Sequence, residues 1–223
     1  RSRATDKRAA PKSTIEFLGR GMTGIVGEPD GATPLNPGEL AGLKFDHVTT
    51  RGELDELEQV NIQAGLLWLG RRRETSILTD DFLRELHRRL FGDVWAWAGI
   101  YRLSEKNIGI QSRQISVSVR TLLEDAKYWA ENNTYLPLEA AARFHHRLVE
   151  IHPFANGNGR HARIAADIYL SECFGRAPID WENGADLTNN TQRRDQYIAA
   201  LRAADGHDYS ALLKFVGVDE KHQ

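Results

Sequence analysis

The sequence has a single cysteine, Cys173, among its 223 residues, which excludes a disulfide within the chain. A lone thiol is consistent with a reducing, cytoplasmic compartment. No stretch approaches the ~20 consecutive apolar residues that cross a bilayer, so we expect no membrane partner. The first residues are basic but lead into no apolar run, which argues against a secretory signal. Because the sequence does not begin with Met, we expect a processed or trimmed chain.

The sequence also lacks a strong charge of either sign. It has 29 Lys and Arg against 31 Asp and Glu, for a net charge of −2. Nucleic acids and acidic lipid surfaces select proteins with a clear basic excess, so we expect no nucleic-acid partner. With 41% hydrophobic and 27% charged residues, the composition is typical of a soluble globular domain.

The chain divides by composition at about residue 46. Residues 1–46 are rich in Gly, Pro and charged residues, which favours an irregular N-terminal arm. Residues 47–223 contain apolar residues at helical spacing and predict one all-α domain. The amphipathic segments lie at 49–70, 78–92, 121–133, 138–151, 161–175 and 193–216. Thr49 or Thr50 is the predicted N-cap of the first segment, and Thr79 that of the second.

One segment has a different periodicity. Lys106 to Val119 reads KNIGIQSRQISVSV, in which polar and β-branched residues alternate. Alternation with a period of two is the pattern of a strand. We therefore expect a short β-hairpin or an extended flap between two helices.

The loop after the fourth amphipathic segment reads IHPFANGNGR, from Ile151 to Arg160. The helix before it brings His152 to its end, where Pro153 stops the helix and is expected to restrict His152 to an extended conformation. Phe154 can fix the loop in the core. Gly157 permits a positive φ or a close backbone approach.

A new helix is expected to begin near Arg160. Free backbone N–H groups at a helix start attract anions, and the helix dipole adds to this. Arg160 and Arg163 lie on one face of the first turn, and guanidinium groups suit phosphate oxygens. His152 beside such a site can deprotonate a hydroxyl directed at phosphorus. A Gly- and Asn-rich turn with a structural histidine is the simpler alternative, but the joint presence of His, Phe, two Gly and two Arg favours the phosphate site.

The stretch HPFANGNGRHAR, His152 to Arg163, resembles the signature H-P-F-x-(D/E)-G-N-G-R-x-x-R of the Fic family. The segments FHHRLVEI and WAGIYR are also similar to that family. From about Thr49 to Val216, dispersed segments such as SEKNIG resemble a Fic subgroup known as mobile mystery protein B.

The resemblance implies an all-α Fic core with a short β-hairpin flap that transfers AMP from ATP to a protein hydroxyl. It implies that His152 is the general base and that Phe154 anchors the loop. The implied phosphate-binding residues are Gly157, Asn158, Gly159, Arg160 and Arg163. Among these, Arg160 would bind the β-phosphate and Arg163 the γ-phosphate. The implied flap, which aligns the target by strand addition, consists of Asn107, Ile108, Gly109, Ile110, Gln111, Ser112, Arg113, Gln114, Ile115, Ser116, Val117 and Ser118.

Asn156 departs from the family pattern, which has Asp or Glu at this position. The resemblance implies that this acid holds Mg²⁺, or Mn²⁺, between the phosphates. An amide oxygen can still bind the ion but carries no charge, so we expect weaker metal binding at Asn156.

The resemblance further implies an inhibitory helix, here about residues 49–69, whose glutamate pairs with the second motif arginine, Arg163. Glu53 has Thr49 four residues before it, whereas Glu58 lies deeper in the apolar helix. We predict that Glu58 is the inhibitory residue, with Glu53 as the alternative. The simpler alternative is that both are solvent-facing helix acids, the ordinary situation of glutamate.

Two functional hypotheses follow. The first is a cytoplasmic bacterial protein adenylyltransferase, autoinhibited, that acts on an unidentified target protein. The second is a catalytically weak Fic-fold regulatory or interaction protein, such as a mobile-element toxin component, or a transferase of another phosphate-containing group. An antitoxin partner and self-association stay open. His145 is predicted to be a packed helix residue, and the sequence does not decide whether Tyr197 or Trp181 borders an adenine site.

Overall fold

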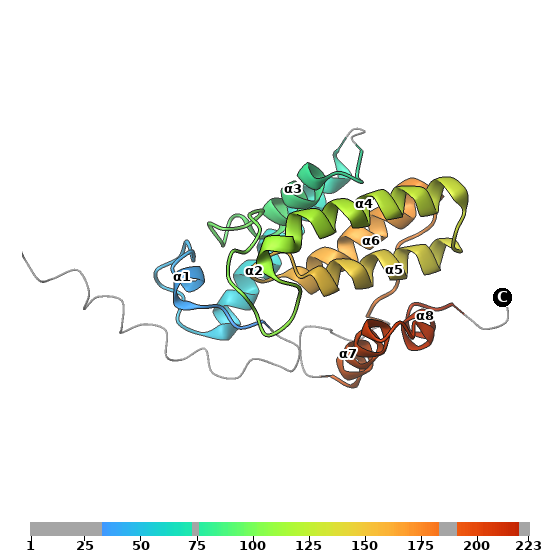
Figure 1. The fold of residues 1–223 in the computed structure, drawn as a ribbon. Coiled ribbons are helices and arrows are strands. Elements are labelled where there is room, and N and C mark those ends of the chain that lie inside the picture. The colour runs from blue at the N-terminus through green and yellow to red at the C-terminus, as the bar shows by residue number, and fades with distance from the viewer. Residues whose placement is uncertain (1–32, 73–75, 183–190, 219–223) are drawn as a thin grey trace, which may run out of the picture.

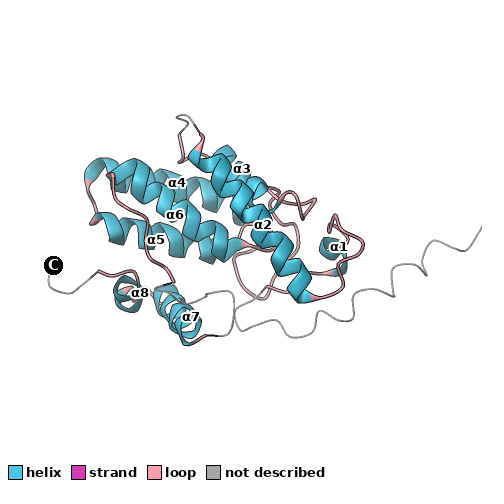
Figure 2. Ribbon diagram, turned by 180° about the vertical axis from the view of Figure 1, so that it is seen from behind, coloured by secondary structure: helices cyan, strands magenta, loops and turns pink. Residues whose placement is uncertain are grey.

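The computed structural model describes residues 33–72, 76–182 and 191–218, and within these ranges the fold is helical (Figure 1). The helices are α1 Pro37–Leu40, α2 Arg51–Gly70, α3 Asp80–Phe91, the short 3₁₀ helix η1 Ser112–Gln114, α4 Ile115–Asn132, α5 Pro137–Ile151, α6 Asn158–Phe174, α7 Gln192–Asp205 and α8 Ser210–Phe215. The described ranges contain no strand, only an isolated bridge between Leu43 and Trp95 (Figure 2). The all-α fold class is therefore confirmed. No helix in these ranges has the length and apolar character needed to span a bilayer.

Helices α5 and α6 form the centre of the fold and pack along each other (Figure 1). Both helices carry short, completely or almost completely buried alanine side chains, and small side chains let neighbouring helices approach closely. These are Ala140, Ala141 and Ala142 on α5 and Ala162, Ala165 and Ala166 on α6. Helix α4 covers α5, α3 contacts α6, α2 packs on α3, and α7 and α8 pack on each other and against α5. The loop between α5 and α6 is thus fixed at both ends by two helices that pack extensively on each other.

The helix starts follow local capping chemistry. The Thr50 side chain accepts a hydrogen bond from the Glu53 N–H, and the Glu53 carboxylate accepts one from the Thr50 N–H, which makes Thr50 the N-cap of α2. Thr79 caps α3 as predicted. Helix α6 begins at Asn158, slightly earlier than expected, with Gly157 as its N-cap in the left-handed region at φ 77°.

The predicted β-hairpin is wrong. Residues 107–111 are irregular, and α4 begins at Ile115. On a strand, Ile115, Val117 and Val119 would share one face. Instead Ile115 and Val119 are 1% and 0% exposed while Val117 is 65% exposed. Residues four apart share a helix face and residues two apart do not. The apolar residues at the start of α4 therefore gave a sequence pattern that resembles the alternation of a strand.

This assignment predicts a large difference between two valines. Val119→Ala is expected to lower the free energy of unfolding by about 2–3 kcal/mol, because it removes buried methyl groups and leaves a cavity. Val117→Ala should change it by less than about 0.5 kcal/mol, since the side chain lies in solvent. Denaturant titration of both variants measures the difference. Equal losses would support a strand in which the two residues share a face.

The N-terminal arm was expected to be irregular, but its described part, residues 33–46, contains the short helix α1 and folds against the domain. The Trp97 Nε1–H donates to the Glu39 carbonyl at 2.9 Å, and the Lys44 N–H donates to the Val94 carbonyl at 2.9 Å. Residues 1–32 of the predicted arm lie outside the described residues. The domain boundary near residue 46 stays a prediction.

Candidate active site

His152 directly follows α5 and adopts a left-handed conformation, with φ 54° and ψ 59°. The expectation of an extended His152 is therefore wrong. Pro153 disfavours the right-handed helical conformation before it, but the left-handed region remains accessible. In that conformation the His152 N–H donates to the Leu148 carbonyl at 3.2 Å, which satisfies a carbonyl at the end of α5.

The hydrogen bonds of His152 define its tautomer. Its Nδ1 lies 3.3 Å from the Val149 carbonyl oxygen, which can only accept, so Nδ1 carries the proton. Nε2 therefore has a free lone pair, and it accepts a hydrogen bond from the Thr33 hydroxyl at 2.6 Å. Burial lowers the pKa of His152 to about 4. At neutral pH the imidazole is uncharged and able to take a proton at Nε2.

A second buried histidine supports the loop. The His87 ring stacks on Phe154 with 3.7 Å between ring centroids. Its Nδ1 accepts from the Gly99 N–H at 3.0 Å, so its protonated Nε2 donates to the Asn156 carbonyl at 3.0 Å. Burial holds the pKa of His87 well below its usual value, which keeps this bonding pattern intact near neutral pH.

The sequence-based prediction did not include His87, although its position on the apolar face of α3 indicates a buried polar side chain. A polar residue on such a face usually has a specific buried partner. The partner could not be named because it lies 69 residues away in the chain.

The loop residues also bond to one another. The Asn158 amide accepts from the Phe154 N–H at 2.9 Å and donates to the Phe154 carbonyl at 2.8 Å. A Cβ at Gly157 would meet the Phe91 ring at 2.7 Å, and its φ is 77°, so only glycine fits there. Asn158 and Gly157 thus shape the loop, in addition to any contact their N–H groups make with an anion.

Arg160 forms an ion pair with Glu58 at 2.6 Å between Nη2 and Oε2. The Trp95 Nε1–H donates to the other carboxylate oxygen at 2.7 Å, and only 5% of the Glu58 side chain is exposed. The structure thus gives the predicted inhibitory glutamate a different partner, because Arg163 was expected. Arg160 lies over the Phe91 ring at the end of α3, beside α2, whereas Arg163 is one turn further along α6.

Glu53, the alternative inhibitory residue, bonds within its own helix start. Its carboxylate accepts from the N–H groups of Thr49 and Thr50 at 2.9 and 3.0 Å. These bonds lower the pKa of Glu53, which is exposed. It contacts neither motif arginine in these interactions, so Glu58 is the glutamate that the fold brings to the loop.

Arg163 faces α7 and lies 5.7 Å from the Tyr197 ring centroid. The Tyr197 hydroxyl contacts His145 Nε2 at 3.0 Å, and His145 also packs on Trp181 at 4.5 Å between rings. His145 is completely buried, as expected for a packed helix residue.

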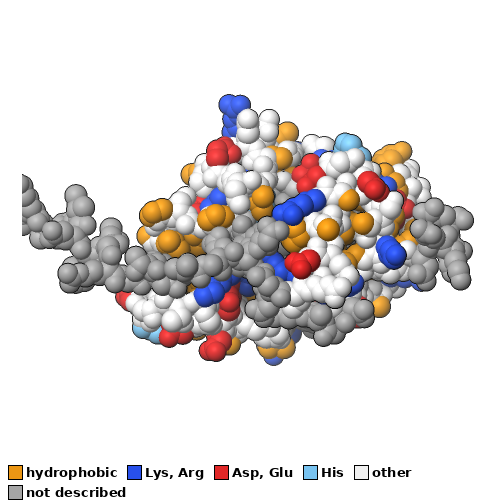
Figure 3. Space-filling model, turned by 90° about the horizontal axis from the view of Figure 1, so that it is seen from below, with side chains coloured by type: hydrophobic (Ala, Val, Ile, Leu, Met, Phe, Trp, Pro, Cys, Tyr) orange, Lys and Arg blue, Asp and Glu red, His pale blue; other side chains and the backbone are white. Residues whose placement is uncertain are grey.

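One cavity combines the candidate catalytic and phosphate-binding groups. Polar groups of the loop line one part, and apolar or aromatic side chains of α5 and α7 line another. The lining includes Thr33, Val149, His152, Asn156, Gly157, Asn158, Gly159, Arg160, Arg163, Tyr197, Ile198 and Leu201. Tyr197 therefore lies on the wall of the same cavity as the loop. On the face of the molecule seen in Figure 3, acidic, basic and hydrophobic side chains of the described residues are interspersed.

Arg102 connects His152 to the segment that precedes η1. Its Nε–H donates to the His152 carbonyl at 2.7 Å, and its Nη atoms donate to the carbonyls of Ser104 and Ile110. A Cβ at Gly109 would lie 2.5 Å from the His152 Cβ, so this segment packs directly against the base of the His152 side chain. The WAGIYR motif contained Arg102, but its role follows only from the tertiary contacts.

The residues present fit a metal ion only as a companion of bound phosphates. In the described part of the chain, no group of three His, Cys, Asp or Glu side chains could hold a metal. Asn156 Oδ1 accepts the Gly157 N–H, and its Nδ2 donates to the Thr33 carbonyl at 3.4 Å. Mg²⁺ is commonly held by one protein ligand together with phosphates and water, and Asn156 can supply that one ligand after reorienting.

Acid should destabilise this protein. Burial lowers the pKa of His152 and His161 to about 4, below the usual 6.5. Between these values the unfolded chain binds more protons than the folded one, so stability is complete above pH 6.5 and falls as the pH decreases. We expect a loss of about 1 kcal/mol per pH unit for each such histidine. Urea unfolding between pH 7.5 and 4.5 measures this loss, and an unchanged free energy of unfolding would contradict it. In His161→Asn the free energy of unfolding should depend less steeply on pH.

Residues 77–170, less than half of the chain, match the model of the Fic/DOC family. The protein adenylyltransferase fic-1 of Caenorhabditis elegans is 28% identical over 167 residues, which are 71% of this chain and 31% of that protein. The protein adenylyltransferase Fic of Drosophila mojavensis is 29% identical over 136 residues, 59% of this chain and 25% of the relative. The chain thus spans about a third or less of the length of these curated relatives.

Solved structures share the fold. Fic-1 (residues 134–508) from C. elegans gives a TM-score of 0.59 at 23% identity, covering 82% of this chain and 54% of that one. The N-terminal FIC domain of Bep8 from Bartonella sp. 1-1C gives 0.59 at 17% identity, covering 80% and 95%. The predicted Fic-type helical core is confirmed by these likenesses.

Proposed function

We propose that this protein transfers AMP from ATP to a hydroxyl side chain of a protein. The observation that carries the proposal is the neutral His152, whose unprotonated Nε2 accepts a hydrogen bond from a hydroxyl inside the cavity lined by Arg160 and Arg163. The curated relatives are protein adenylyltransferases, which supports the same reaction.

In the proposed reaction His152 Nε2 takes the proton of the acceptor hydroxyl. The hydroxyl oxygen forms a bond to the α-phosphorus, and the bond from that phosphorus to the bridging oxygen of the β-phosphate breaks. Pyrophosphate leaves with the electron pair. The backbone N–H groups at the start of α6, from Asn158 to Arg160, stabilise the negative charge on the phosphates.

The proposed ATP position follows the lining of the cavity. Arg160 would bind the β-phosphate and Arg163 the γ-phosphate, while Tyr197 and Ile198 would border the adenine. Phe154 and His87 keep the loop in shape. Mg²⁺ or Mn²⁺ would be held mainly by the phosphates, with the Asn156 amide oxygen as its protein ligand, and would offset phosphate charge.

We propose that Glu58 restrains the reaction by holding Arg160. A bound polyphosphate must compete with a nearly buried carboxylate for the guanidinium group, and it must do so while Trp95 holds that carboxylate in position. The restraint therefore acts on the β-phosphate contact rather than on the γ-phosphate contact that the resemblance implied.

The biological setting belongs to the same proposal. We infer a bacterial, cytoplasmic protein of the mobile mystery protein B subgroup, acting on a protein target that contacts residues 107–114 above His152. An antitoxin or a second copy of the chain would be its regulatory partner. No membrane or nucleic acid is required for this activity.

A catalytically weak regulatory protein is the second candidate. It is favoured by the neutral Asn156 and by the occupied Arg160. Such a protein would bind ATP and transfer nothing.

Label transfer from ATP separates the two candidates. Wild type and Glu58→Gln are incubated with Mg²⁺ or Mn²⁺, a bacterial lysate, and ATP labelled at the α- or the γ-phosphate. Protein labelled only from the α-position supports AMP transfer. Label from the γ-position indicates phosphate transfer, and no label in any lane, with ATP bound, supports the regulatory protein.

A further inference from the structure

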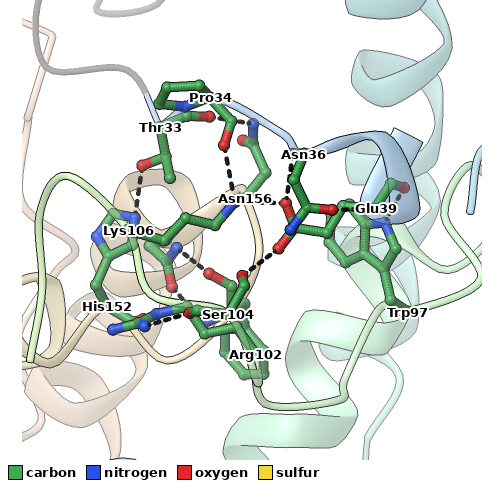
Figure 4. A network of polar contacts seen from close by, with 12 residues as sticks. Thr33, Pro34, Asn36, Glu39, Trp97, Arg102, Ser104, Lys106, His152 and Asn156 are labelled. Carbon is green, nitrogen blue, oxygen red and sulfur yellow. Dashed lines mark hydrogen bonds and ion pairs between the residues drawn. The ribbon is translucent and has the colours of Figure 1, made fainter. Parts of the chain in front are cut away.

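The Thr33 hydroxyl occupies the place where an acceptor hydroxyl is expected. It donates to His152 Nε2 at 2.6 Å, although the two residues are 119 positions apart in the chain (Figure 4). Thr33 is 6% exposed and lines the same cavity as Arg160. The proton to be removed, the base and the phosphate-binding groups therefore face one space.

The chain just after Thr33 is fixed beside the site. Lys106 donates to the Pro34 carbonyl at 2.7 Å and forms an ion pair with Glu39, with both side chains largely buried. Ser104 donates to the other Glu39 oxygen at 2.7 Å. Glu39 and Asn36 also form a capping box at the start of α1 (Figure 4). These contacts hold the Thr33 backbone from the segment 104–106, which Arg102 connects to His152.

Asn156 adds a contact that an acidic residue could not make. Its Nδ2 donates to the Thr33 carbonyl at 3.4 Å. A carboxylate in its place would have no proton to donate and would repel the carbonyl oxygen. The amide at this position is therefore suited to holding Thr33 in front of His152.

We propose that Thr33 is an acceptor of AMP within its own chain. This inference rests on the function proposed above. His152 Nε2 takes the Thr33 hydroxyl proton, the Thr33 oxygen bonds to the α-phosphorus of ATP, and the bond to the bridging oxygen breaks. The products are AMP esterified to Thr33 and pyrophosphate, which leaves with the electron pair.

Site-specific labelling tests this. The full chain carrying Glu58→Gln is incubated with α-labelled ATP, Mg²⁺ or Mn²⁺ and bacterial lysate, and its peptides are analysed by tandem mass spectrometry. We expect an AMP adduct on the peptide that contains Thr33. Thr33→Val should lower the self-label at least tenfold, Thr33→Ser should retain it, and Thr134→Val, at an exposed threonine, should leave it unchanged.

A mixing experiment tests whether transfer occurs within one chain. Isotopically heavy His152→Ala chain, inactive but with Thr33 intact, is incubated with an excess of unlabelled Glu58→Gln chain, whose own Thr33 adduct shows that transfer occurs. We expect no adduct on Thr33 of the heavy chain. An adduct there would show transfer between chains and would overturn the intramolecular reaction.

The outcomes keep the two proposals apart. If lysate proteins or other residues of the chain are labelled from the α-position while Thr33 is unmodified, the assignment of Thr33 is overturned and the proposed function stands. If nothing is labelled in any lane, with ATP bound and both metals tested, the proposed function fails and the Thr33 assignment fails with it.

Discussion

Replacing His152 by alanine is expected to lower the rate of AMP transfer by about 10²- to 10⁴-fold, the usual contribution of a general base. The structure gives the reason. His152 is uncharged near neutral pH, its Nδ1–H faces the Val149 carbonyl, and its Nε2 lone pair faces a hydroxyl. Alanine has no proton acceptor, so the hydroxyl would have to attack as a neutral group.

Initial rates of α-label transfer measure this effect, and equilibrium ATP binding should remain within about threefold, because the phosphate contacts come from α6. His146→Ala is the matched control, since it removes a buried imidazole from α5, the helix that ends directly before His152. His146 bonds to Tyr209 and Asp205 at 3.0 and 2.9 Å, away from the cavity. That variant should lose stability but transfer AMP normally per folded molecule. Equal loss of transfer in both variants would refute the role of His152.

Neutralising Glu58 is expected to raise AMP transfer by about tenfold or more, because one charged contact that holds Arg160 is worth more than about 1.4 kcal/mol when it is largely buried. In Glu58→Gln the amide oxygen can still accept from Trp95, while the amide nitrogen faces the guanidinium group and cannot bind it. Arg160 is then available to phosphate. The same change should lower the melting temperature, since Arg160 loses its partner and its side chain is only 20% exposed.

Transfer rate, ATP affinity and thermal unfolding are measured side by side. The matched control is Glu53→Gln, which neutralises an exposed glutamate of the same helix that bonds at the N-terminus of α2. It should leave the transfer rate unchanged. If Glu58→Gln neither transfers faster nor binds ATP more tightly than wild type, Glu58 has only a structural role.

Introducing an acid at position 156 would test how the loop responds to the residue that the Fic signature, which it resembles, has at this position. An aspartate there would offer a charged ligand to the metal ion but would lose the donor that faces the Thr33 carbonyl. The two effects oppose each other: metal affinity would rise while the arm would be held less firmly. The asparagine is therefore consistent with a site adapted to its own N-terminal arm.

Three features of the structure differ from the sequence-based predictions, each for a physical reason. Residues 115–119 alternate in polarity over too short a stretch to distinguish a strand from the first turn of α4. The buried apolar face continues through Leu122 and Ala126 at helical spacing, which is the pattern of a helix. The conformation of His152 was misjudged because Pro153 excludes one helical region and leaves another open. The partner of Glu58 was misassigned because the spacing of two arginines on α6 does not reveal which of them faces α2.

What the sequence determined by itself was local. Most of the length of the long helices, the threonine caps of α2 and α3 and the glycine-dependent loop between α5 and α6 follow from periodicity and backbone chemistry, which act over a few residues. The tertiary structure decided every contact between distant segments: Thr33 on His152, Glu58 on Arg160, and His87 under the loop. These pairs depend on how helices and arm pack on one another. A hydrogen bond between residues 119 positions apart leaves no periodic trace in the chain, so only the folded molecule shows that a threonine of the N-terminal arm lies against the predicted base.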